Sequence, residues 1–282
     1  MNKRIFQVKL SFCIAFLFIL IFFHFPVQGY GLIIRREATI TKQDTLIDVE
    51  KVQTIISKAD SSWIESYERK IPKKRIIFKK GKVYHYKAIY ISSNNDTLSN
   101  SFINIIATGD RWNEQPETQD LIYYEFPNYR TDSIKLSNHY INKELHAWKG
   151  KIGEGVIENI EQVWMHPIRA NQYKFTEVAP FPEVHFPLQK GKKWKRIVNV
   201  IKGWGEWNGQ TVISKYKISG QTTYQEGDIE INCWIIKSVS KCSSGKSKLN
   251  TFFNEEWGFV KMEYHNYENE KLVFELVNVE EK

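Results

Sequence analysis

The sequence has little cysteine and no long hydrophobic run, and both shortages limit what the chain can be. Only three of its 282 residues are cysteine, which excludes a small fold held together by a disulfide framework. The longest apolar run, residues 10–23, has 14 positions, whereas a membrane-spanning helix needs roughly 18–20. Eight prolines and 15 glycines exclude a fibrous chain, and 42% hydrophobic residues exclude a disordered one.

Catalytic and metal-binding signatures are also missing. The sequence has no HExxH motif, no paired-cysteine zinc spacing and no serine in a nucleophile elbow. Gly150, Gly153 and Gly155 lie close together but lack the strand-then-helix context of a phosphate-binding loop. We therefore predict no metal and no other cofactor, and we favour a non-enzymatic function.

The chain begins with what is predicted to be an export signal. Lys3, Arg4 and Lys9 come before the apolar run, and the chain after it reaches a boundary at Gly29. A cationic start, a short apolar core and small residues near a boundary, here Val27 and Gly29, are typical of a secretory signal peptide. We expect residues 1–29 to be removed and the protein to be secreted into the periplasm or cell envelope. The alternative is an uncleaved N-terminal anchor that holds the chain at the membrane.

Residues 30–72 are predicted to form an N-terminal segment with one amphipathic helix between Asp48 and Glu68. Its apolar residues have helical spacing: Val52, Ile55, Ile56, Ala59 and Trp63. Close after it come Lys73, Lys74 and Arg75, which could contact a membrane surface or could lie on edge strands as solvated charges. Nucleic acid is not expected as a partner of an exported protein.

Residues 73–282 are predicted to form an antiparallel β domain. Strand-like runs are Val83–Ile91, Phe102–Ala107, Leu121–Phe126, Trp194–Glu206, Thr211–Ser219, Ile229–Val239, Lys248–Phe253, Phe259–His265 and Leu272–Val279. Asn208-Gly209 is a strong hairpin signal. In the C-terminal runs apolar residues alternate with Lys and Glu, which indicates one buried and one solvated face. We predict a mainly β fold: a large curved antiparallel sheet, a half-barrel or open barrel with meander topology. Cys233 and Cys242 are predicted to be free thiols, because nine residues of extended chain would keep them apart.

The segment from Glu161 to His185 combines ionisable residues with prolines. Three prolines exclude an ordinary central strand, so we expect a shaped loop over the mouth of the sheet. Candidate catalytic residues are Glu161, His166, Arg169 and Glu177. Glu161 or Glu177 could exchange protons with His166 while Arg169 orients an anionic substrate. The structural alternative is that His166 and Arg169 pair with these glutamates and fix the loop.

Aromatic residues provide candidates for a ligand site. The candidates are Trp164, Phe181, His185, Trp204, Trp207 and Trp234. Such residues could form an aromatic platform or apolar groove for a lipid, a sugar or another amphipathic small molecule. The alternative is plain core packing with aromatic cross-strand pairs.

Residues 190–279 are similar to exported bacterial half-barrel proteins such as the outer-membrane lipoprotein carriers. The likeness lies in Gly191–Trp194, the hairpin at Asn208-Gly209, and Asn254–Val260. The whole chain also resembles uncharacterised exported proteins of Bacteroidota, through Trp164–Pro167 and Pro180–Pro182. This resemblance implies a long sheet curled around an apolar cavity, and binding of a hydrophobic molecule.

Three functional hypotheses follow. The first is a non-enzymatic envelope protein whose curved sheet binds an apolar or amphipathic ligand, with residues 161–187 framing the mouth. The second is a hydrolase-like enzyme that uses Glu161, His166, Arg169 and Glu177. The third is a carbohydrate-binding surface built on Trp204, Trp207 and Trp234.

Overall fold

The computed structural model describes residues 76–112, 119–136, 139, 147–226 and 229–281, all within one compact unit, Leu46–Lys282. The predicted signal peptide, the predicted helix at Asp48–Glu68 and the basic residues Lys73–Arg75 lie outside the described residues. In the part of the chain that is described, no helix is long and apolar enough to cross a bilayer.

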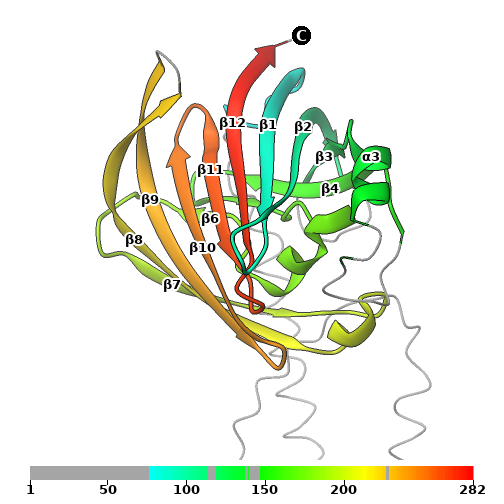
Figure 1. Cartoon of the computed structure of the whole chain (residues 1–282). Helices are drawn as coiled ribbons and strands as arrows, with labels where there is room; N and C mark the ends of the chain where they lie inside the picture. Colours follow the sequence, from blue (N-terminus) through cyan, green and yellow to red (C-terminus); the bar gives the residue numbers. More distant parts are fainter. Residues whose placement is uncertain (1–75, 113–118, 137–138, 140–146, 227–228, 282) are drawn as a thin grey trace, which may run out of the picture. The chain divides into compact units, whose positions relative to one another are not determined.

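One antiparallel sheet of twelve strands dominates the structure (Figure 1). The strands are β1 Lys82–Ile91, β2 Thr97–Arg111, β3 Asp120–Glu125, β4 Lys151–Glu158, β5 Gln162–Met165, β6 Glu183–His185, β7 Lys193–Asn199, β8 Thr211–Glu226, β9 Ile229–Cys242, β10 Gly245–Asn254, β11 Gly258–His265 and β12 Lys271–Glu281. The helices are α3 Tyr129–Lys135 and two 3₁₀ helices, η1 Asn171–Val178 and η2 Gly205–Trp207. The predicted fold, a curved and unclosed antiparallel sheet, is confirmed.

The strand order is β6-β5-β4-β3-β2-β1-β12-β11-β10-β9-β8-β7. Strands β1–β6 form one meander and β7–β12 form another, and the two join where β1 pairs with β12. The two edges of the sheet are therefore β6 and β7, which follow each other in the chain. Among the described strands, no backbone ladder joins β6 to β7.

Side chains alternate across the sheet as the sequence indicates. Tyr216 and Ile218 are buried while Lys215 and Lys217 are exposed, and Leu272, Phe274 and Leu276 form another buried row. The predicted free thiols at Cys233 and Cys242 are confirmed.

The predicted strand Trp194–Glu206 is too long. Strand β7 ends at Asn199, and residues 200–210 form a longer connection that contains η2. Trp207 is fully buried and its indole N–H donates to the Tyr267 hydroxyl at 3.0 Å, so the chain must turn inward before β8 begins. Gly209, in the left-handed region at φ 74°, donates its N–H to the Val200 carbonyl and closes this connection.

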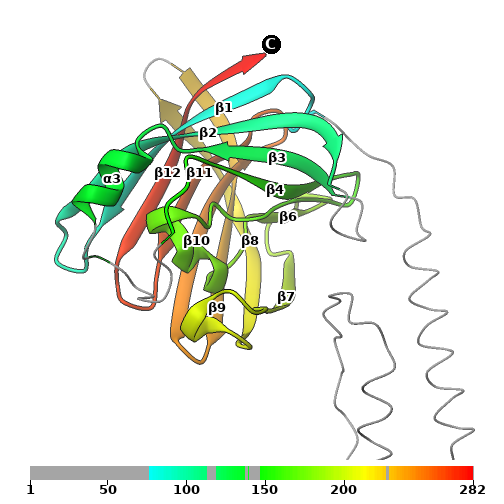
Figure 2. The same ribbon diagram turned by 90° about the vertical axis from the view of Figure 1, so that its right-hand side faces the viewer.

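The concave side of the sheet is occupied by the chain itself. In the segment His166–Pro182, the side chains of Tyr173, Phe175 and Val178 on η1 are buried in the core. The Phe175 ring lies 6.0 Å from Tyr90 of β1, and the Ser240 hydroxyl of β9 donates to the Val178 carbonyl at 3.2 Å. Figure 2 shows this short helix inside the curve of the sheet. The segment was predicted to form a loop over the mouth; it fills the concave face instead, because its aromatic side chains bury themselves there.

Candidate functional site

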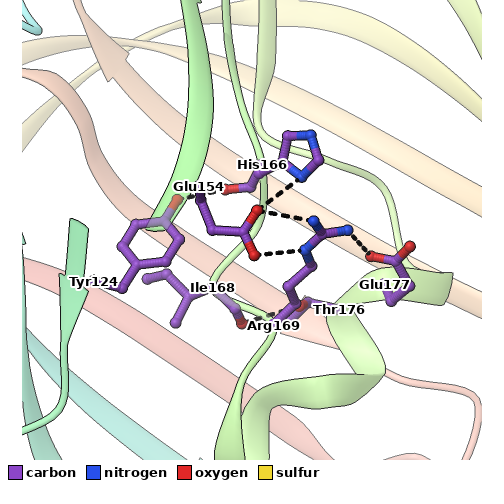
Figure 3. A network of polar contacts seen from close by, with 7 residues as sticks. All are labelled: Tyr124, Glu154, His166, Ile168, Arg169, Thr176 and Glu177. Carbon is purple, nitrogen blue, oxygen red and sulfur yellow. Dashed lines mark hydrogen bonds and ion pairs between the residues drawn. The ribbon is translucent and has the colours of Figure 1, made fainter. Parts of the chain in front are cut away.

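A cluster of four charged or ionisable side chains lies where the inserted segment meets β4. Glu154 shares one face of β4 with the buried residues Val156 and Glu158, while His166 and Arg169 follow β5 and Glu177 lies on η1 (Figure 3). The backbone that carries His166 and Arg169 is fixed at two points. The Tyr124 hydroxyl donates to the His166 carbonyl, and the Thr176 hydroxyl donates to the Ile168 carbonyl.

Arg169 is the centre of this cluster. Its Nε and Nη2 donate to the two Glu154 oxygens, each at 2.8 Å, in the bidentate geometry that suits a guanidinium and a carboxylate. Its Nη1 donates to Glu177 Oε2 at 2.7 Å. His166 Nδ1 lies 3.1 Å from Glu154 Oε2. The side chains are 5–18% exposed, so the ion pairs are shielded from solvent.

The pKa values of the two glutamates are shifted in opposite directions. Burial alone would raise the pKa of Glu154, but the His166 hydrogen bond and the Arg169 guanidinium outweigh burial and hold that pKa below its ordinary value. Burial raises the pKa of Glu177, and its single contact with Arg169 does not compensate, since the Glu154 charge acts in the same direction as burial. Glu154 therefore carries the more stable negative charge.

The structure brings together three of the four predicted catalytic residues: His166, Arg169 and Glu177. Glu161 lies elsewhere; it is exposed, in the turn between β4 and β5, where its N–H donates to Asn159 Oδ1 at 2.8 Å. Its place is taken by Glu154. Because both carboxylates bind Arg169 and His166 also contacts Glu154, the geometry favours the structural alternative, in which the cluster anchors the inserted segment to β4.

A second constellation lies where the two sheet edges meet. We call it the seam and define it by Trp164, Glu183 and His185 of β5–β6 and Trp194 and Arg196 of β7. The Glu183 carboxylate accepts hydrogen bonds from Arg196 Nε and from His185 Nε2, the latter at 2.6 Å. The Arg196 guanidinium lies 5.3 Å from the centre of the Trp164 ring, and His185 stacks on Trp194 at 4.9 Å. The seam is thus held by side chains alone.

Strands β5 and β6 are covered on both faces. Trp164 lies opposite Glu183, and Val163 lies opposite Val184, so each pair occupies one face of the two strands. All four side chains are buried. Burial would raise the pKa of Glu183, but His185 and Arg196 outweigh it and lower the pKa below its ordinary value, so the carboxylate stays charged.

Two indole N–H groups at the seam have no hydrogen-bond partner among the described residues. Trp164 is 4% exposed and its Nε1 is buried, and the Nε1 of Trp194 is buried as well. Buried indoles usually find an acceptor, and a buried donor without one costs about 1–3 kcal/mol. Two such donors at one seam are therefore a feature that calls for an acceptor.

The six predicted ligand residues separate into two groups. Trp164, Phe181 and His185 lie at or beside the seam, with the Trp164 and Phe181 rings 6.1 Å apart. The other three do not form one exposed platform. Trp204 and Trp234 are half-buried against the core, and Trp207, for which exposure was expected beside the Asn208-Gly209 turn, is buried because η2 turns it inward.

The site residues predicted from the sequence do not include Glu154, Trp194 or Arg196. The sequence around Glu154 does contain an indication of a site, because Glu154 stands between two glycines in a strand. Glycine in a strand often marks a place where another group approaches the backbone closely. A Cβ on Gly155 would lie 1.8 Å from Gln119 Oε1 and 2.4 Å from Trp112 Cε3. The Trp112 ring in turn lies 5.6 Å from His166, so Gly155 leaves room for a ring that covers the charged cluster.

The structure also bears on metal binding and on thiol chemistry. Within the described residues, no group of three or more His, Cys, Asp or Glu side chains could hold a metal ion. Cys233 is buried, and burial raises the pKa of its thiol to about 11, which disfavours the nucleophilic thiolate.

Comparison with known proteins gives likenesses of structure only. No protein-family model matches the chain, and no curated protein sequence matches it. A protein of Bacteroides fragilis, described as exported and as having a YmcC-like fold, aligns with a TM-score of 0.42 and 8% identity over 75% of this chain and 98% of its own. A protein of Parabacteroides distasonis, described as a lipoprotein, gives 0.40 and 8% over 74% and 99%. The hypothetical lipoprotein YmcC of Escherichia coli gives 0.30 and 8% over 78% and 96%.

None of the three is described as a lipoprotein carrier, so the likeness to carriers stays a prediction. At 8% identity these likenesses assign no site residue in this chain.

Proposed function

We propose that this protein is an exported, non-enzymatic binding protein of the cell envelope, and that it holds an apolar or amphipathic ligand at the seam. The signal peptide predicted at residues 1–29 supports export. The observation that carries the binding proposal is the pair of buried indole N–H groups, on Trp164 and Trp194, without acceptors among the described residues.

The chemistry of the seam suggests what the ligand offers. The two indole donors need oxygen acceptors, and the aromatic rings of Trp164, His185 and Trp194 favour an apolar or ring-shaped body. Glu183 already neutralises Arg196, so the ligand needs no net charge. An amphipathic molecule with hydroxyl, ester or carboxyl oxygens at its polar end meets these requirements.

The topology suggests how such a molecule would enter. Strand β7 alternates between half-buried and exposed residues along its length, and it contacts β6 through side chains. Moving it away from β5–β6 breaks no backbone ladder. We place the ligand at the seam and not in the predicted cavity of the curved sheet, because η1 and its neighbours already occupy the concave face.

The test uses the full chain, purified without detergent, and the fluorescent fatty acid cis-parinaric acid as the probe. Trp164→Phe and Trp194→Phe each keep an aromatic ring and remove one indole donor. We expect each to weaken binding about tenfold, the equivalent of one lost hydrogen bond of about 1.4 kcal/mol.

Trp257→Phe is the matched control, because Trp257 is half-buried in the β10–β11 turn and is not one of the seam residues. Equal affinity in all three variants, or no binding of the probe by the wild-type chain, contradicts the proposal. Native mass spectrometry of the same preparation would show whether a co-purified small molecule is present and whether it is lost with the two seam variants.

An acid–base function of the charged cluster is the second candidate. The raised pKa of Glu177 and the lowered pKa of Glu154 form the opposed pair that proton-transfer sites often contain. A panel of nitrophenyl esters and glycosides tests it: turnover that Glu177→Gln abolishes while the fold is retained would favour the enzyme, and no turnover would favour the binding protein.

A further inference from the structure

We infer that the outward face of strands β7–β10 docks on an anionic phospholipid surface. This lysine face consists of eight exposed residues, two from each strand: Lys193 and Lys195, Lys215 and Lys217, Lys237 and Lys241, and Lys246 and Lys248. It shares no residue with the basic run at Lys73–Arg75, which lies outside the described residues, and it does not depend on the binding proposed at the seam. In Figure 1 its strands lie together along one side of the sheet.

The pairing register places these lysines directly opposite one another. Lys193 faces Lys217, which faces Lys237 on the next strand. Lys195 faces Lys215, and Lys241 faces Lys246. Directly opposite residues on one face have Cβ atoms about 4.5–5.5 Å apart, and like charges at that distance destabilise a sheet. The arrangement therefore works against the stability of the free protein.

No acid compensates the lysine face. The other outward residues on these stretches are uncharged: Ile197, Asn199, Thr211, Ile213, Val239 and Asn250. Within the described residues, none of the eight lysines forms an ion pair. Lys261 of β11 shows the contrast, since it lies between Glu263 at 3.1 Å and Glu275 at 3.0 Å.

Protection of a sheet edge does not explain the pattern. Lysines on an edge strand prevent pairing with another chain, and this accounts for Lys193 and Lys195 of β7. Strands β8, β9 and β10 are paired on both sides and have no free edge to protect. Of the eight lysines, Lys248 also affects a neighbour: after burial and Lys271, which is not part of the lysine face, it contributes to lowering the pKa of His265.

Exposed isoleucines favour a lipid surface over a soluble polyanion. Ile197 and Ile213 face each other beside the lysines and are 42% and 36% exposed, and Ile201, just after β7, is 68% exposed. A bilayer surface satisfies both groups, because anionic headgroups attract the lysines while the isoleucines enter the interfacial region. A hydrophilic polysaccharide would leave the isoleucines in water.

The experiment is flotation of the full chain with vesicles of phosphatidylglycerol and phosphatidylcholine, compared with phosphatidylcholine alone. The test variant combines Lys193→Gln, Lys215→Gln, Lys217→Gln and Lys237→Gln. The control combines Lys80→Gln, Arg111→Gln, Lys135→Gln and Lys149→Gln, which are exposed residues outside β7–β12 and remove the same net charge. Every variant has the same N-terminal sequence up to residue 75, with the same signal-peptide processing, so any membrane affinity of that segment is common to all.

We expect the wild-type chain and the control variant to prefer the anionic vesicles, and the test variant to lose at least about a hundredfold in partitioning. Ile197→Ser with Ile213→Ser should weaken binding to the anionic vesicles and retain its salt dependence. Equal binding to both kinds of vesicle, or equal losses in the test and control variants, overturns the proposal. So does full displacement from the vesicles by polygalacturonate, which would assign the face to an acidic polysaccharide.

Discussion

At the scale of single residues, the charged cluster consists of two glutamates that share the guanidinium of Arg169 unequally. Glu154 has two contacts with Arg169 and one with His166, whereas Glu177 has one contact with Arg169. The number of partners decides the direction of each pKa, because both carboxylates are buried to a similar extent. The same difference predicts unequal effects of neutralising them.

Glu154→Gln should destabilise the protein by about 3 kcal/mol at neutral pH, since it leaves Arg169 and His166 without their main partner in a buried site. Glu177→Gln should lower the free energy of unfolding by less, because Glu177 has only one contact with Arg169. The lowered pKa of Glu154 means that its contribution is present above its unfolded pKa and is lost as the pH falls through its folded pKa. The raised pKa of Glu177 means the reverse. Its contribution to the free energy of unfolding is greatest in acid and is lost as the pH rises through the pKa of Glu177 in the folded protein.

Urea denaturation at a series of pH values measures both effects. The Glu154→Gln variant should show a shallower loss of stability in acid than the wild type, and Glu177→Gln should gain relative stability between mildly acidic and neutral pH. Parallel curves for all three proteins would contradict the assignment of opposite directions.

Gly155 is a second residue-scale prediction. Gly155→Ala should cost about 1–3 kcal/mol, because its Cβ would overlap the Trp112 ring, which is rigid, as well as the flexible end of Gln119. Gly153→Ala is the control on the same strand; its Cβ would meet only Leu121 and Tyr123 side chains, at 3.3 Å and 3.5 Å. Thermal unfolding of the two variants should differ clearly, and equal melting temperatures would refute the overlap.

At the scale of elements, Glu158 joins β4 to the segment before β1. Its two carboxylate oxygens accept the backbone N–H groups of Ile76, Ile77 and Phe78 at 2.8–2.9 Å. Glu158→Ala should leave these donors unpaired, cost about 2–3 kcal/mol and speed hydrogen exchange at the three amides. Glu125→Ala, which removes a more exposed pair with Lys151 at 3.1 Å, should cost less than about 1 kcal/mol. Unchanged hydrogen exchange at the three amides in the Glu158 variant would show that Glu158 does not hold the segment before β1.

The elements also show what the sequence could and could not reveal. Rows such as Leu272, Phe274 and Leu276 were predictable because apolar residues alternate with polar ones. On β9 the buried face continues through Ser238 and Ser240, and no hydrophobic pattern marks a buried serine. The segment around η1 looked like a surface loop because it contains the polar residues Asn171, Gln172 and Glu177. In the structure these residues are buried, because specific hydrogen bonds and ion pairs satisfy their polar groups.

The candidate sites divide along the same line. His166, Arg169 and Glu177 were predictable as a group because they are close in sequence. Glu154, Trp194 and Arg196 come from other strands, and only the folded sheet brings them to their partners. The pairing of β1 with β12 is likewise non-local, so the alternation pattern predicts a meander but not where its two halves join.

At the scale of the whole molecule, that junction has a consequence for the order of the chain. The strands β7 to β12 followed by β1 to β6 form one uninterrupted series of neighbours, and Lys82 lies opposite Glu281 where the halves join. The natural chain is thus a circular permutation of a simple meander. A permuted gene that opens the chain at Gln189, between β6 and β7, and links Glu281 to Ile76 would make every paired strand a sequence neighbour. Such a protein should fold faster than the parent, because its contact order is lower, while its two new ends would lie at the seam.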